Sequence, residues 1–176
     1  MPRLSRFVRH VLPIAGAALG LVPAVAGAQG AAPPARATGD RAAVMAVVQT
    51  LFDGMRAGDS AMVRAVFDPR VRMITVASRN GAPRTSVELG ADTFAKAVGT
   101  PHPDIWDERI ANERVEIDGD LASVWVDYAF FAGPKFSHCG VDHFLLVRND
   151  AGQWRILELA DTRRTTGCEA WTKAKG

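Results

Sequence analysis

Hydrophobic side chains recur with a helical period at the start of the region expected to fold. Counted from Val44, apolar residues follow at positions three, four, seven, eight and eleven, and the last of them is Met55. This spacing lines one face of an α-helix, which we expect to begin near Asp40 and to end at Gly58. The first element is therefore predicted to be an amphipathic helix with one buried face.

A second, shorter helix and a strand pair are predicted next. Asp59 can cap the helix, and Asp68-Pro69 ends it because the residue before a proline disfavours helical backbone. Residues 70–78 are rich in β-branched side chains, Asn80-Gly81 is a strong hairpin turn, and residues 84–87 can return as a short strand. The apolar positions of the helix are Met62, Val63, Val66 and Phe67.

The second half of the chain has the pattern of antiparallel strands joined by short turns. A third helix over residues 88–98 and a proline-containing loop over residues 99–104 precede it. The expected strands are residues 106–117, 121–132, 136–148 and 153–162. Because each connection is short, sequential neighbours are expected to pair. The order helix, helix, strand pair, helix and four strands predicts an α+β fold with a curved sheet wrapped around helices.

The first 28 residues have the pattern of a secretory signal peptide. A basic start with three arginines, an apolar run over residues 11–25 and the small-residue cleavage site Ala26-Gly27-Ala28 follow one another. The apolar run is too short and too interrupted by Pro and Gly to predict a membrane span. We expect residues 29–39 to be a disordered linker, residues 40–168 one domain and residues 169–176 a tail. The protein is therefore expected to be exported, periplasmic or secreted, without an integral membrane anchor after cleavage.

Cleavage of this segment changes the charge balance of the chain. It removes three of the 21 basic side chains and none of the 19 acidic ones, so the mature protein carries a small net negative charge. The basic character of the full chain therefore belongs to the signal peptide. Without a basic excess or a clustered Lys/Arg face, nucleic-acid binding is not expected.

The chain has two cysteines, Cys139 and Cys168. In an oxidising compartment an even pair can form a disulfide, and we expect these two to be bridged. The alternative is two buried thiols that never meet.

Three segments resemble the nuclear transport factor 2-like superfamily: Leu51-Phe52-Asp53-Gly54-Met55, Gly119-Asp120-Leu121-Ala122 and Gly152-Gln153-Trp154-Arg155-Ile156. Together with the element order, the resemblance covers about residues 40–168 and is nearest to exported bacterial SnoaL-like or lumazine-binding-like members. It implies a cone-shaped fold, with a cavity between the concave face of the sheet and the first helices. Because this superfamily includes enzymes, binders and assembly modules, the resemblance implies no single activity.

Polar residues between apolar neighbours in strands are the candidates for chemistry in such a cavity. Asp127, Asp142, His143 and Asp161 fit this description. Because side chains alternate between the faces of a strand, only one of Asp142 and His143 can face the cavity.

A histidine near a carboxylate in an apolar cavity can carry out general acid/base chemistry. Scytalone dehydratase and ketosteroid isomerases use this logic without metal or cofactor. By resemblance, His143 would be the acid/base, Asp127 its orienting partner or a second base, and Tyr128 or Trp125 a hydrogen-bond donor to the substrate. The alternative is a strand histidine satisfied by a neighbouring carboxylate at the sheet surface.

The segment Asp161-Thr162-Arg163-Arg164 also has two interpretations. Its arginines can form bidentate hydrogen bonds with a ligand carboxylate or phosphate, which would make Asp161 and Arg163 ligand-binding residues. Alternatively they pair with local acids, Asp142 or Glu158, and hold the C-terminal extension beside Cys168. The sequence contains no zinc-like Cys/His spacing and no Gly-rich phosphate loop, so neither a metal nor a cofactor is expected.

Three functional hypotheses follow. In the first, the protein binds a small, largely apolar molecule in its cone. In the second, it is a cofactor-free isomerase, dehydratase or cyclase that uses His143 and Asp127. In the third, it is a homodimeric structural or assembly module, because both faces of the strand over residues 121–132 are largely apolar.

Overall fold

The computed structural model describes residues 35–79 and 82–172. The expected signal peptide lies outside these residues, as do Asn80-Gly81 of the predicted hairpin turn. No described helix is long and apolar enough to cross a membrane.

Helix α1 (Ala35–Ala57) forms where the helical period predicts it. The apolar stripe is buried: Val44, Val48, Leu51, Phe52 and Met55 are each at most 4% exposed. The helix begins about five residues before its expected start and includes part of the predicted linker. Ala35, Arg36 and Ala37 are strong helix formers, in agreement with this earlier start.

Helix α2 (Ser60–Val66) starts at the predicted cap. The Asp59 carboxylate accepts hydrogen bonds from the backbone N–H groups of Ala61 and Met62, each at 2.9 Å. The helix ends one residue earlier than predicted, because Phe67 is already extended and begins strand β1 (Phe67–Arg79). Helix α3 (Asp92–Gly99) is shorter than predicted, since strand β2 (Ala82–Leu89) continues to Leu89.

The six strands form one sheet in the order β2-β1-β6-β5-β4-β3. As expected, the strands of the second half pair with their sequence neighbours: β3 (Trp106–Asp118), β4 (Leu121–Ala132), β5 (Lys135–Arg148) and β6 (Trp154–Arg163). All pairs are antiparallel except β1 with β6, which joins the two parts of the sheet in parallel.

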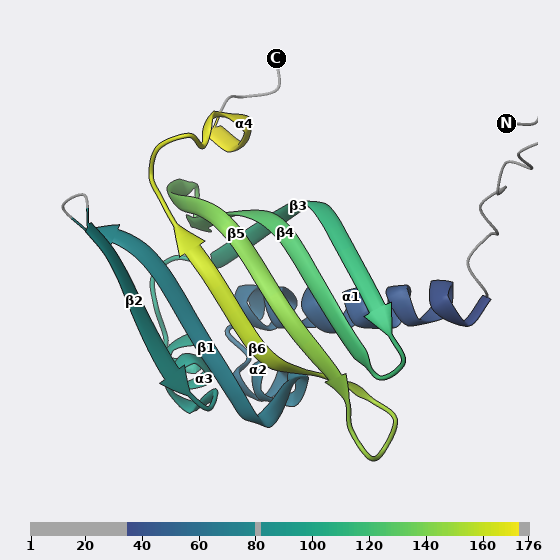
Figure 1. Ribbon diagram of the computed structural model, residues 1–176. Coiled ribbons are helices and arrows are strands. Elements are labelled where there is room, and N and C mark those ends of the chain that lie inside the picture. Colours follow the sequence, from purple (N-terminus) through teal and green to yellow (C-terminus); the bar gives the residue numbers. More distant parts are fainter. Residues whose placement is uncertain (1–34, 80–81, 173–176) are drawn as a thin grey trace, which may run out of the picture. The chain divides into compact units, whose positions relative to one another are not determined.

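The helices cover one face of this curved sheet (Figure 1). The main apolar core lies between them, and Phe52 of α1 meets Phe144 of β5 edge to face at 6.1 Å. The predicted α+β class, a curved sheet wrapped around N-terminal helices, is confirmed.

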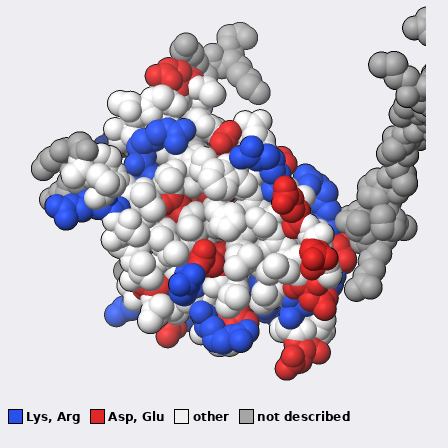
Figure 2. Space-filling view, viewed as in Figure 1, with Lys and Arg blue, Asp and Glu red and all other residues white. Residues whose placement is uncertain are grey.

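The opposite face of the sheet is not covered by described residues at its centre. Leu121 is 48% exposed and Trp125 is 42% exposed. Figure 2 shows a largely uncharged area over the central strands, with charged side chains around it. We call this surface the outer face.

The predicted cysteine pair is bridged, with a Cys139–Cys168 disulfide. Beside it, Cys139 and Arg164 exchange two backbone hydrogen bonds of 2.9 and 3.0 Å. A second, small apolar cluster surrounds the sulfurs, and the short helix α4 (Glu169–Thr172) follows within the predicted tail. Besides the two cysteines, this cluster contains Ala129, Phe131, Phe136 and Trp171.

Candidate functional site

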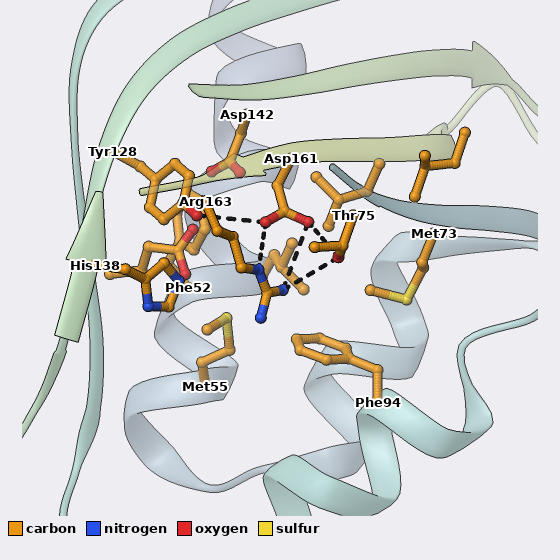
Figure 3. Close-up of a pocket in the computed structure, with 14 residues that line it drawn as sticks. Phe52, Met55, Met73, Thr75, Phe94, Tyr128, His138, Asp142, Asp161 and Arg163 are labelled. Carbon is orange, nitrogen blue, oxygen red and sulfur yellow. Dashed lines mark hydrogen bonds and ion pairs between the residues drawn. The ribbon is translucent and has the colours of Figure 1, made fainter. Parts of the chain in front are cut away.

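A cavity lies between the inner face of the sheet and helices α1 and α3 (Figure 3). Its volume is about 80 Å³, and it shares lining residues with an adjoining hollow of about 320 Å³. A single water needs roughly 10–15 Å³ by such a measure, and ligand pockets run to roughly 300–1,000 Å³. The two spaces together therefore suit a small organic molecule. Much of the inner cavity is apolar, lined by Leu51, Phe52, Met55, Met73, Ile74, Phe94 and Leu159.

Polar groups from five strands line the remainder of this cavity. Strand alternation brings Tyr128, His138 and Asp142 to the inner face together with the core residues of β4 and β5. On β6 a bulge opposite Leu145 and Leu146 shifts the phase of the strand, so that Asp161 and Arg163 also reach the inner face. The other two polar lining residues are Thr75 of β1 and Glu108 of β3.

Asp161 is the centre of the hydrogen-bond network (Figure 3). Its carboxylate accepts bonds from the Thr75 hydroxyl at 2.6 Å and from Arg163 Nε at 2.6 Å. The Tyr128 hydroxyl lies 3.3 Å from Asp161 Oδ2 and 2.9 Å from the Thr162 carbonyl oxygen. Arg163 and Asp161 thus neutralise each other inside the site.

Glu108 and Asp142 form a second group of acids, which we call the carboxyl pair. Burial is the largest cause that raises the pKa of Asp142. The negative charge of Glu108 and a hydrogen bond with Glu108 raise it further. Burial also raises the pKa of Glu108, to about 7, against the lowering effect of its hydrogen bond with Asp142. Asp142 is 2% exposed, and its buried Oδ2 atom has no hydrogen-bond partner among the described residues. The carboxyl pair therefore retains a proton near neutral pH.

Tyr128 and His138 are held in their uncharged forms. Burial and the charge of Asp161 raise the pKa of the Tyr128 phenol, so it remains a hydrogen-bond donor. Burial and the charge of Arg163 lower the pKa of His138, so its imidazole is neutral at pH 7. The two rings meet edge to face, with their centroids 5.6 Å apart.

Gly140 allows the polar groups to come together. A Cβ atom at this position would lie 1.7 Å from the Thr162 carbonyl oxygen and 2.7 Å from the Tyr128 ring. Any side chain here would therefore push β6 or Tyr128 out of place.

The arrangement can donate and accept hydrogen bonds and can exchange protons. Tyr128 and Arg163 supply donors, while the carboxyl pair can act as acid or base near neutral pH. Within residues 35–79 and 82–172, no three His, Cys, Asp or Glu side chains are placed to hold a metal ion.

The structure brings only part of the predicted site together. Tyr128, Asp161 and Arg163 line the cavity, as the ligand-binding prediction requires. His143, Asp127 and Trp125 do not, because they lie on the outer face, in the opposite phase of β4 and β5.

The predicted His143–Asp127 pairing is also not found. His143 Nε2 lies 3.0 Å from the Ser123 hydroxyl, and Asp127 accepts a bond of 2.7 Å from Asn112. The Trp125 and His143 rings are neighbours, with centroids 6.1 Å apart, at the surface.

Sequence reasoning did not select Glu108 and His138, and it considered Asp142 without placing it in the site. The phase of the strands contained a signal for two of them. His138 and Asp142 are in the same phase of β5 as Phe144 and Leu146, which form its buried apolar face. Glu108 had no such signal, because β3 has mixed polarity and a bulge after Ala111 that breaks its alternation.

Comparison with known proteins agrees with this fold. The family model described as Putative lumazine-binding matches residues 39–159. A search of curated proteins gave no significant match.

Several solved structures are similar to the chain. An NTF2-like protein with a cystatin-like fold from Novosphingobium aromaticivorans has a TM-score of 0.61 at 14% identity, over 77% of this chain and 88% of that one. A protein from the same organism, described as a Putative Scytalone Dehydratase, has a TM-score of 0.59 at 13% identity, over 73% and 87%. At these identities the likeness shows the fold alone. Since the family model covers more than half of the sequence, the chain belongs to the Putative lumazine-binding family, and its fold is like that of NTF2-like proteins.

Proposed function

We propose that this protein is exported and binds a small, largely apolar molecule in the cavity described above. The observation that carries the proposal is an apolar cavity whose polar groups are concentrated on β4, β5 and β6. Such a site buries the body of a ligand against Phe52, Phe94 and Met55 and orients it through a few hydrogen bonds. The family match is consistent with small-molecule binding.

A cofactor-free isomerase, dehydratase or cyclase is the second candidate. The carboxyl pair favours it, because a carboxyl with a pKa near 7 is suited to both accept and donate a proton at neutral pH. The acid/base residues would then be Glu108 and Asp142 in place of His143 and Asp127.

A homodimer is proposed for the assembled state. The support is the outer face, where Leu121 and Trp125 are exposed over a largely uncharged area. In this arrangement His143 and Asp127 would lie in the dimer interface, while the cavity on the other face of the sheet stays free for the ligand.

Native mass spectrometry of the protein purified from its own host tests these proposals together. We expect the mass of a dimer, a chain that starts at Gln29, and an additional small molecule that is released on denaturation. A chain that still begins at Met1 contradicts export, and a monomeric mass at micromolar concentration contradicts dimerisation. An empty protein that takes up no small molecule on screening would overturn ligand binding.

Deuterium exchange distinguishes a binder from an acid/base enzyme. The released molecule is added back to the protein in D2O, and its mass is followed with time. An enzyme that removes a proton from carbon introduces deuterium into the molecule, and Glu108→Gln should abolish this uptake. A binder leaves the mass of the molecule unchanged.

A further inference from the structure

The carboxyl pair consists of two acidic side chains without a described ion-pair partner. No described Lys, Arg or His forms an ion pair with Glu108 or Asp142, although other acids of the domain are paired. Asp142 lines the cavity, and its buried Oδ2 atom has no hydrogen-bond partner among the described residues. Leaving a carboxylate buried and unpaired is costly, so this oxygen is suited to a partner that arrives with the ligand.

The nearby arginine compensates for this charge only in part, because Arg163 acts to lower the pKa values of Glu108 and Asp142 while Asp161 acts to raise them. Arg163 Nε is bonded to Asp161 at 2.6 Å, and its Nη2 lies 3.3 Å from the Thr75 hydroxyl. Its charge is thus matched by Asp161, and His138 is neutral. Once the carboxyl pair has lost one proton, the cavity holds one uncompensated negative charge.

The remaining lining is suited to an organic cation. Phe52, Phe94 and Tyr128 present aromatic rings, and Met55 and Met73 present thioethers. Aromatic faces attract ammonium groups, and a buried carboxylate binds them with charge-assisted hydrogen bonds.

We propose that the cavity selects a small organic cation, with a protonated amine set against Glu108 and Asp142 and a ring-sized apolar body among the aromatic and methionine side chains. This inference rests on the proposed binding function and names the chemical class of its ligand. It follows from the unpaired Asp142 oxygen, from the pairing of Arg163 with Asp161, and from the apolar lining.

Binding of a cation should release a proton. The titratable and charged groups that face the carboxyl pair come from β3, β4, β5 and β6, with Arg56 of α1 beside Glu108. A cation favours the ionised form of the pair, so the proton held near neutral pH leaves when the amine binds. Affinity should therefore rise from pH 6 to pH 8. The facing groups are Glu108, Tyr128, His138, Asp142, Asp161 and Arg163, together with Asp107 beside Glu108 and Arg56 of α1, which donates to the Glu108 carbonyl oxygen and is paired with Asp107.

Calorimetric titration with three probes of nearly equal shape tests the proposal: benzylamine, benzyl alcohol and benzoate. We expect benzylamine to bind at least tenfold more tightly than benzyl alcohol at pH 8, with benzoate the weakest. Asp142→Asn and Glu108→Gln should each remove this preference. Asp127→Asn is the matched control, because it makes the same chemical change on the outer face and should leave all three affinities unchanged.

Other outcomes of the calorimetric titration contradict cation selection. Equal affinity for benzylamine and benzyl alcohol overturns cation selection but leaves small-molecule binding intact. A preference for benzoate also overturns it and assigns ligand selection to Arg163. Failure of all three probes overturns the proposed class, and the proposed function falls with it only if the protein also purifies without a ligand. If Asp142→Asn does not fold, by its thermal transition, Glu108→Gln decides alone.

Discussion

At the residue scale, the site depends on a position that has no side chain. Gly140 pairs with Tyr128 across β4 and β5, and the end of β6 passes close to its Cα atom. This close approach lets the Tyr128 hydroxyl reach both Asp161 and the Thr162 carbonyl. A glycine in a strand normally weakens it, so its presence here has a geometric cause.

Gly140→Ala should therefore damage both stability and site geometry. The added methyl meets backbone atoms of Thr162 that cannot move freely, so we expect a loss of about 1–3 kcal/mol or more in urea unfolding. Displacement of Tyr128 from Asp161 should bring its raised pKa back toward the usual value. Tyr128 is the only tyrosine in the chain, so a spectrophotometric titration reports on it directly.

Gly39→Ala is the control for this variant. Gly39 lies in α1 with no atom within 4 Å of an added Cβ, so alanine should raise stability by up to about 1 kcal/mol. An unchanged transition in Gly140→Ala would show that the strands accommodate the methyl group.

At the element scale, the phase of each strand decides which polar groups meet. His138 and Asp142 share the inner face of β5, while His143 lies on the outer face. Bulges in β3 and β6 shift the phase partway along each strand, and the second brings Asp161 and Arg163 to the cavity. The order of the elements and most of their bounds were predictable from the hydrophobic period. These phase shifts were not, because a bulge depends on the pairing of two strands.

The disulfide holds the ends of two of these elements together. It links β5 to the segment after β6 across 29 positions of sequence. In the chain-entropy model, a loop of this length contributes about 3–4 kcal/mol. Cys139→Ala/Cys168→Ala should lower the free energy of unfolding by about that amount, measured by guanidinium unfolding.

A thiol assay of the denatured wild-type protein accompanies this measurement. We expect no free thiol before reduction and two after it. Two reactive thiols in the unreduced protein would contradict the disulfide, and an unchanged unfolding free energy in the double variant would show that it adds no stability.

At the scale of the whole molecule, stability should depend on pH through the carboxyl pair. Glu108 and Asp142 both have a folded pKa above the unfolded value, so the folded state binds more protons between about pH 4.5 and pH 7. The free energy of unfolding therefore falls as pH rises through this window. We expect a fall of about 1–3 kcal/mol, because one pKa unit corresponds to about 1.4 kcal/mol and Glu108 is partly screened by solvent.

Thermal unfolding from pH 4.5 to pH 8 measures this dependence. Asp142→Asn removes one member of the pair and should flatten the curve, whereas Asp127→Asn should not. Asp53 and Asp68, whose pKa values are lowered by Arg56 and Arg70, add stability that is lost only below about pH 4. A flat profile between pH 5 and pH 7 in the wild type would show that the carboxyl pair is not buried as described.

The sequence by itself determined the element order and the α+β class, because periodicity and turn residues are local signals, and it indicated the cysteine pair through an even cysteine count and the expected export. The candidate site was only partly accessible in this way: Tyr128, Asp161 and Arg163 were identified, while Glu108, His138 and the role of Asp142 were not. Only the tertiary structure decided which strand face encloses the cavity, since that depends on where the helices pack. It also decided the chemistry, because Glu108 of β3 and Asp142 of β5 form the carboxyl pair only once the fold brings them together in a low-dielectric interior.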